Sequence, residues 1–287
     1  MLLYILMLLA AAVMVYALMK YKKGYMWGKQ VAVGAAIIAI ICAFSTLFTG
    51  GGPNTEKLAK KSQRYQQIAA QKLGSYLASE HPKAKTVILS HMDYSSIQPN
   101  ADKEKLPTSV EKFKRQEEAL KEGAGGQLNI IKIVHPEIPE EARSMMQPPE
   151  GAETGEGDTP YPMDFMPMEM EMMMQAEDYN NALSGHLDNC DLLIMLRNLP
   201  YDIEKMQVWQ MSSPPKVALM QPANLSKLKE PIKQGLITAV VARKPDAEYD
   251  LKGSIPNDVE KAFNRRYLLL TPKNIEEISQ KYETLFP

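Results

Sequence analysis

The hydrophobic pattern begins with two uncharged apolar stretches, residues 1–19 and 31–48. As a helix the first would be about 28 Å long, close to the hydrocarbon core of a bilayer at about 30 Å. The connecting residues 20–29 carry four lysines and three aromatic side chains, which is typical of a cytoplasmic loop at the headgroup layer. We therefore predict a transmembrane hairpin over residues 1–50 in the inner (cytoplasmic) membrane. The remainder then lies in the periplasm or outside the cell, although basic residues after the second stretch reduce the charge difference that sets this orientation.

Residues 51–80 have the pattern of a linker followed by an amphipathic helix. A glycine-rich start leads to Asn54, a residue type that caps helix N-termini. Leu58, Tyr65 and Ile68 then begin a series of apolar residues at helical spacing. The pattern predicts a helix of about 25 residues that leads into the following domain.

Short apolar runs then alternate with amphipathic stretches to the end of the chain. The six runs are residues 86–90, 129–134, 191–196, 216–220, 237–242 and 266–271. Helical patterns occupy residues 109–122, 175–188, 224–234, 257–264 and 273–284. Runs that are apolar without strict alternation are typical of strands covered on both faces. We predict a single α/β domain, residues 81–287, with a doubly wound and mostly parallel sheet.

One segment, residues 136–174, breaks this rhythm. It is rich in Pro, Gly, Glu and Met and holds ten acidic residues against one arginine, which predicts a long insertion. Its thioethers are soft ligands that suit Cu(I) or Ag(I). The same side chains would also provide an adaptable surface for a partner or membrane, or serve no specific role. The candidate thioether ligands are Met163, Met166, Met168, Met170, Met172, Met173 and Met174.

The alternation of strands and helices over residues 60–285 resembles one lobe of a type I periplasmic binding protein, or another Rossmann-like domain. The resemblance is carried by the strand–helix rhythm and not by a diagnostic motif, so it implies architecture alone.

Charge and cysteine content exclude some functions. The first 53 residues hold four lysines and no acid, which leaves 29 basic against 34 acidic groups in the rest. An acidic soluble part is a poor binder of nucleic acid, so no nucleic-acid partner is expected. The two cysteines define no disulfide framework.

Polar residues follow each predicted strand, and in open parallel sheets ligands bind at these carboxyl ends. The candidate ligand-binding residues are His91, Asp93, His135, Arg197, Asn198, Gln221, Asn224, Arg243 and Lys244. Two arginines and a lysine among them could hold a carboxylate, a phosphate or a sugar acid. The alternative is that these residues form ordinary solvated turns.

His91 and Asp93 are the only catalytic candidates. At a spacing of two they would share one face of a strand, and a histidine with a carboxylate is the smallest acid–base unit. No nucleophile motif, glycine-rich nucleotide loop or recognisable metal motif accompanies them. The sequence therefore predicts neither a cofactor nor a conventional metal site.

Three functions remain open. The leading hypothesis is a non-catalytic, membrane-tethered module that binds a small anionic or sugar ligand, or a protein partner, within an envelope assembly. The second is a hydrolase- or transferase-type enzyme with its site at the strand ends. The third is Cu(I) or Ag(I) handling by the methionine-rich segment.

Overall fold

The chain divides into two compact units, Met1–Ser62 and Gln63–Pro287. The computed structural model describes residues 53–92, 108–140, 173–247 and 253–286, together with Val13, Tyr16, Met19, Lys20 and Val31. Apart from those five residues, both predicted membrane stretches lie outside the described residues, so the hairpin stays a prediction. Among the described helices, none combines the length and apolar character needed to cross a membrane.

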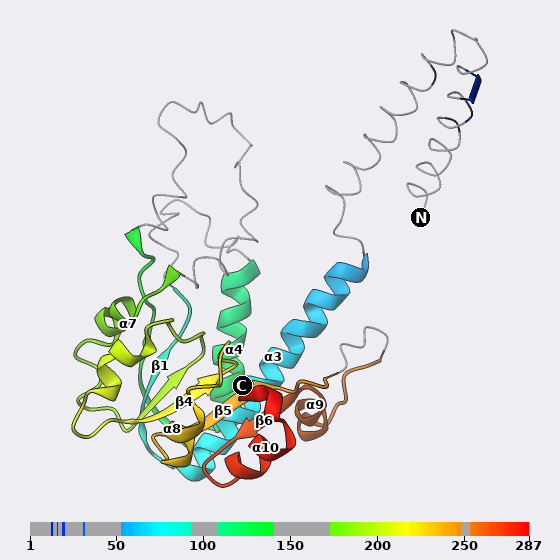
Figure 1. The fold of residues 1–287 in the computed structure, drawn as a ribbon. Helices are drawn as coiled ribbons and strands as arrows, with labels where there is room; N and C mark the ends of the chain where they lie inside the picture. The colour runs from blue at the N-terminus through cyan, green and yellow to red at the C-terminus, as the bar shows by residue number, and fades with distance from the viewer. Residues whose placement is uncertain are drawn as a thin grey trace, which may run out of the picture. The chain divides into compact units, whose positions relative to one another are not determined.

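The second unit is built on a six-stranded sheet in the order β2-β1-β3-β4-β5-β6 (Figure 1). Its strands are β1 (Lys85–Leu89), β2 (Asn129–Val134), β3 (Leu192–Met195), β4 (Lys216–Met220), β5 (Ile237–Arg243) and β6 (Tyr267–Leu270). Neighbours from β2 to β5 pair in parallel. All six predicted strands are confirmed, and so is the mostly parallel α/β sheet.

Strand β6 runs antiparallel to β5, with Arg243 opposite Tyr267 and Val240 opposite Leu270. The helix before it, α9 (Val259–Arg266), continues into β6 without a loop. Strand β6 thus begins directly where α9 ends, beside the carboxyl end of β5.

Helices cover both faces of the sheet (Figure 1). The others are α3 (Pro53–Glu80), α4 (Thr108–Ala124), α7 (Ala176–Leu183), α8 (Lys229–Lys233) and α10 (Ile275–Lys281), with 3-10 turns η2 (Ile203–Lys205), η3 (Gln207–Trp209) and η4 (Glu283–Leu285). Leu73 of α3, Leu120 of α4 and Phe263 of α9 share one core cluster with Ile88 of β1. Helices α7, α8 and α10 pack in the second cluster with Val87. Successive residues of β1 thus face opposite layers, as a doubly wound sheet requires.

Helices α7 and α8 are shorter than predicted. Gly185, with a φ of +72°, follows the end of α7 and takes a backbone conformation that favours glycine. Before α8, the Asn224 side chain accepts hydrogen bonds from the backbone N–H and the hydroxyl of Ser226. This side-chain turn replaces the first helical turn that the apolar pattern suggested.

Two glycines allow α3 and α4 to cross with their backbones in contact. An added Cβ at Gly74 would lie 2.1 Å from the carbonyl oxygen of Leu120. One at Gly123 would lie 2.0 Å from the carbonyl oxygen of Gln71. Only a residue without a side chain fits at either position.

His81, directly after α3, is expected to make folding stability sensitive to pH. Its Nε2 lies 2.7 Å from Thr238 Oγ1. Burial lowers the pKa of His81, and the charge of Lys216 adds to this while that of Glu80 opposes it. The contribution of His81 to stability is therefore complete above the ordinary histidine pKa of about 6.5, and it is lost as the pH falls from there through the lower folded-state pKa.

We expect His81→Gln to reduce this pH dependence. The amide can still bond Thr238 but does not titrate. Urea denaturation of the full chain at about pH 7 and about pH 5 should show a smaller loss of unfolding free energy in the variant than in the wild type. An equal loss in both proteins would contradict the role of His81.

Candidate functional site

The carboxyl ends of β1, β2 and β3 form the candidate site. From β1 the chain adds β2 on one side of the sheet and then β3 on the other, so the strand order reverses between β1 and β3. In open α/β sheets a crevice forms at such a reversal. His91 follows β1, His135 follows β2 and Arg197 follows β3 within two residues of each strand end.

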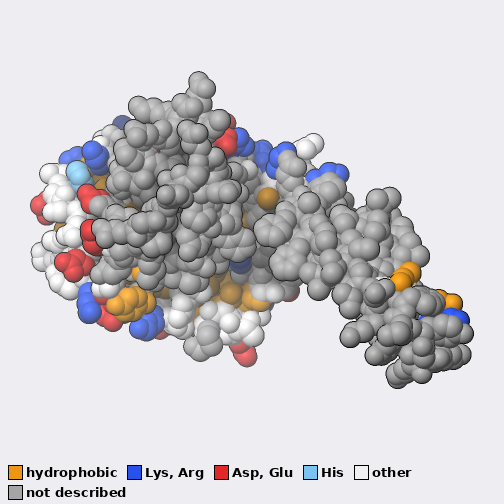
Figure 2. All heavy atoms as spheres, turned by 90° about the horizontal axis from the view of Figure 1, so that it is seen from above, with side chains coloured by type: hydrophobic (Ala, Val, Ile, Leu, Met, Phe, Trp, Pro, Cys, Tyr) orange, Lys and Arg blue, Asp and Glu red, His pale blue; other side chains and the backbone are white. Residues whose placement is uncertain are grey.

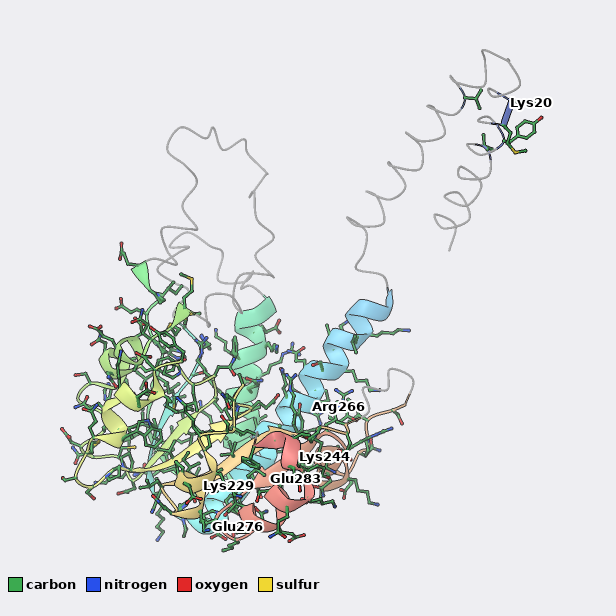
Figure 3. All side chains as sticks on the ribbon, in the orientation of Figure 1. Lys20, Lys229, Lys244, Arg266, Glu276 and Glu283 are labelled. Atoms are coloured by element: carbon green, nitrogen blue, oxygen red, sulfur yellow. The ribbon has the colours of Figure 1, made fainter. Side chains whose placement is uncertain are left out.

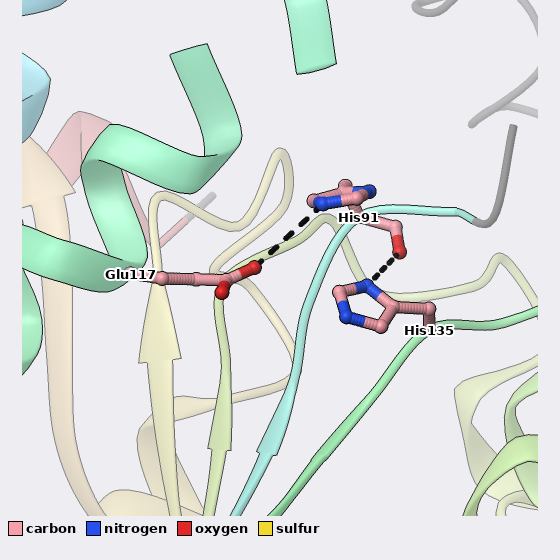
Figure 4. A group of neighbouring side chains, drawn as sticks. All are labelled: His91, Glu117 and His135. Carbon is pink, nitrogen blue, oxygen red and sulfur yellow. Dashed lines mark hydrogen bonds and ion pairs between the residues drawn. The ribbon is translucent and has the colours of Figure 1, made fainter. Parts of the chain in front are cut away.

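The two histidines lie against each other, with ring centroids 4.4 Å apart (Figure 4). His91 Nδ1 lies 2.7 Å from the carbonyl oxygen of Met92, and His135 Nδ1 lies 3.0 Å from that of His91. A carbonyl only accepts, so both Nδ1 atoms carry the proton. In the neutral imidazoles the lone pair is then on Nε2.

Glu117 of α4 completes the cluster, and sequence reasoning did not single it out. Its Oε1 lies 3.8 Å from His91 Nε2 (Figure 4). It also accepts a hydrogen bond from the hydroxyl of Ser90, the residue after β1. His91 and Glu117 are 7% and 8% exposed, while His135 is the most exposed of the three. Nothing in the run of charged residues around Glu117 distinguishes it from a solvated helix face.

Phe113 and Arg197 border the same cluster. The Phe113 ring centroid lies 5.8 Å from that of His91 and 5.8 Å from Arg197 Cζ. Arg197 is only 2% exposed. The site therefore joins one aromatic face, one guanidinium, one carboxylate and two imidazoles.

The surroundings favour the neutral form of His91. Burial lowers the pKa of His91, and the nearby His135 and Arg197 lower it further. The hydrogen bond to the Met92 carbonyl and the carboxylate of Glu117 oppose this shift without reversing it. A neutral imidazole with its lone pair on Nε2 can accept a hydrogen bond or bind a metal ion.

The remaining described residues of the predicted set make other contacts. Gln221 after β4 and Arg243 at the end of β5 pair with each other, with Arg243 Nε donating to Gln221 Oε1 over 3.1 Å. Lys244, labelled in Figure 3, donates to the carbonyl oxygen of Asn264 in α9. Asn224 forms the turn before α8 described above, and the Asn198 carbonyl accepts from Tyr179. Of the predicted set, the structure thus brings together His91, His135 and Arg197, while Gln221 and Arg243 pair with each other at the ends of β4 and β5.

Asp93 and most of the methionine-rich segment lie outside the described residues. The acid–base pair of His91 with Asp93 therefore stays a prediction, as does Cu(I) or Ag(I) binding. Of the candidate thioethers, Met174 is 1% exposed within the hydrophobic core, and Met173 packs against that core.

An open hollow of about 360 Å³ lies beside His135, between the end of β2 and α7. Its lining includes Glu137, Asp178 and Asn181. On the described part of the face in Figure 2, basic and acidic side chains are interspersed.

No protein-family model matches the sequence, and no curated protein matches it. Among solved structures, the chain is similar to a carbohydrate transporter solute-binding protein from Agrobacterium radiobacter in complex with D-arabinose (13% identity, TM-score 0.39, covering 78% of this chain and 63% of that chain). It is also similar to an arabinose-binding protein from Geobacillus stearothermophilus (8%, TM-score 0.37, 72% and 62%). A third is a sugar ABC transport substrate-binding protein from Bordetella parapertussis (14%, TM-score 0.35, 62% and 41%). The chain spans less than two thirds of the length of each of these proteins, and no residue role is carried over from them.

Proposed function

We propose that the α/β domain is a non-catalytic binding module for a small hydroxylated acid, such as a sugar acid, at the carboxyl ends of β1, β2 and β3. The single observation that carries the proposal is the meeting of His91, His135 and Arg197 from three strands beside Glu117. Residues from separate strands converge here at the place where open α/β sheets bind ligands.

The mixture of polar groups supports this ligand class. The Nε2 atoms of both histidines and the Glu117 carboxylate accept hydrogen bonds, as hydroxyl groups of a ligand require. The Arg197 guanidinium donates in pairs, which suits a carboxylate. Phe113 offers an apolar face for the carbon skeleton.

The proposal includes a membrane anchor at the N-terminal end of the chain. The stretches 1–19 and 31–48 would tether the module to the inner membrane, with the binding domain in the periplasm or outside the cell. In that position it would serve as a ligand-binding or interaction subunit of an envelope assembly.

The test is a thermal-shift and calorimetric screen of the full chain against sugar acids, hydroxy acids and neutral sugars. A ligand at 100 times its Kd should stabilise the fold by about 2.7 kcal/mol. We expect Arg197→Gln to weaken binding of an acid at least about tenfold, because a paired charge-assisted contact is lost. The matched control is Arg243→Gln, which removes an arginine at the end of β5 and should leave affinity unchanged.

If Arg197→Gln does not fold, the same binding measurement is made on His135→Asn, because His135 is the most exposed residue of the cluster. This variant should also bind the ligand more weakly. The proposal is wrong if no compound in the screen binds, or if binding is insensitive to Arg197→Gln and to His135→Asn. If Arg243→Gln and Arg197→Gln reduced the affinity for the ligand equally, the ligand would not bind at the ends of β1, β2 and β3.

A further inference from the structure

His91, Glu117 and His135 bring three potential metal ligands together at the proposed site (Figure 4). One ligand atom from each side chain lies within 4.8 Å of the other two. Tetrahedral ligands around Zn²⁺ lie about 3.4 Å apart, given bond lengths of about 2.1 Å. Small side-chain rotations would therefore bring the three atoms onto one ion.

The hydrogen bonds behind the two histidines are those that a metal site requires. Each ring donates its Nδ1–H to a backbone carbonyl, of Met92 for His91 and of His91 for His135. Metal-binding histidines are oriented in this way, with the second nitrogen free to coordinate. With the proton on Nδ1, the neutral form of each ring has its lone pair on Nε2, the nitrogen through which it would coordinate a metal ion.

A hydrogen bond also orients Glu117, the third ligand. The Ser90 hydroxyl donates to the Glu117 carboxylate and fixes it beside His91. A buried carboxylate next to neutral imidazoles is stabilised by a bound cation. With an ion in place, Arg197 would give the site an excess of positive charge, which attracts an acidic ligand.

We propose that these three side chains hold one divalent transition-metal ion of the Zn²⁺ or Co²⁺ type, and that the oxygens of the acidic ligand complete its coordination. The inference rests on the proposed function, because it assigns the recognition of the acidic ligand at that site to a bound metal ion. Two imidazoles with one carboxylate suit Zn²⁺, Co²⁺, Ni²⁺ or Fe²⁺ better than Mg²⁺ or Ca²⁺, which prefer oxygen ligands. Three protein ligands leave positions open for a ligand.

The test is calorimetric titration of the full chain with Zn²⁺, together with the visible absorption of Co²⁺. We expect one ion per chain and a visible Co²⁺ band that His135→Gln and Glu117→Gln each remove, with affinity falling at least about tenfold. His186→Gln is the matched control, because His186 follows α7 and is not part of the cluster. Neither ion is a preferred partner of thioethers, so the methionine-rich segment should not contribute.

The variants are checked for folding by circular dichroism before titration. Should Glu117→Gln not fold, the more exposed His135→Gln decides the question. The metal proposal is overturned if the wild type binds neither ion, or if His135→Gln and His186→Gln bind as the wild type does.

Ligand screens on zinc-loaded and chelator-treated chain separate the two proposals. An acid that binds only the zinc-loaded chain supports both. An acid that binds equally to both preparations overturns the metal proposal and leaves the binding function standing. Zinc binding through the three residues, with no compound bound, supports the metal site and overturns the ligand proposal.

Discussion

Replacing Gly74 with alanine is expected to lower the free energy of unfolding by about 3 kcal/mol, because the backbones of α3 and α4 would have to separate. The new methyl group would lie 2.1 Å from the Leu120 carbonyl oxygen, and neither group can rotate away. Helix propensity alone predicts the opposite sign, since alanine is favoured over glycine in a helix interior by about 1 kcal/mol. The sign of the change therefore distinguishes close helix contact from propensity.

Urea denaturation of the full chain provides the measurement, with a shift of the midpoint at constant slope as the expected signature. Ser75→Ala is the matched control, because Ser75 is the exposed next residue of the same helix. It should change stability by less than about 0.5 kcal/mol. A stabilised Gly74→Ala variant would show that α3 and α4 do not cross in contact.

Replacing Phe263 with alanine is expected to lower the free energy of unfolding by about 4 kcal/mol. The side chain is 1% exposed, and its ring centroid lies 5.7 Å from that of Tyr267. It fills the core between α9 and the sheet, so the truncation leaves a cavity in addition to the lost burial.

Phe263→Leu keeps most of the apolar volume. Urea denaturation should show that it lowers the free energy of unfolding by less than half as much as Phe263→Ala does. Similar values for Ala and Leu would mean that the ring itself, and not the filled volume, stabilises this part of the core. A loss near zero in Phe263→Ala would contradict the burial of α9 against the sheet.

The inner strands could be predicted from the sequence because they are apolar runs covered on both faces, as Leu192 to Met195 of β3 show, whereas the edge strand β2 is largely exposed. The direction of β6 could not, since its run is as apolar as the others. The direction depends on where the connection of residues 244–266 delivers the chain, and α9 at its end leads directly into β6 beside the carboxyl end of β5.

The site was predictable only in part for a similar reason. His91, His135 and Arg197 follow strands that are neighbours in the sheet, whereas Arg243 follows β5, which is separated from β3 by β4. The strand order depends on long-range packing, so no local pattern could exclude Arg243. Glu117 and Phe113 come from α4, and only the crossing of that helix over the strand ends makes them part of the site.

The pairing of β1 with β3 has a consequence for changes in chain length. Lys85 and Asp191 are 106 residues apart, yet the backbone N–H of Lys85 donates to Asp191 Oδ2 over 2.9 Å. Loop-closure entropy grows only logarithmically, so each doubling of a loop costs about 0.6 kcal/mol. By this term alone, a change of a few residues in the length of the connection between β1 and β3 would cost little stability, provided that the core residues Ile138 and Met174 stay in place.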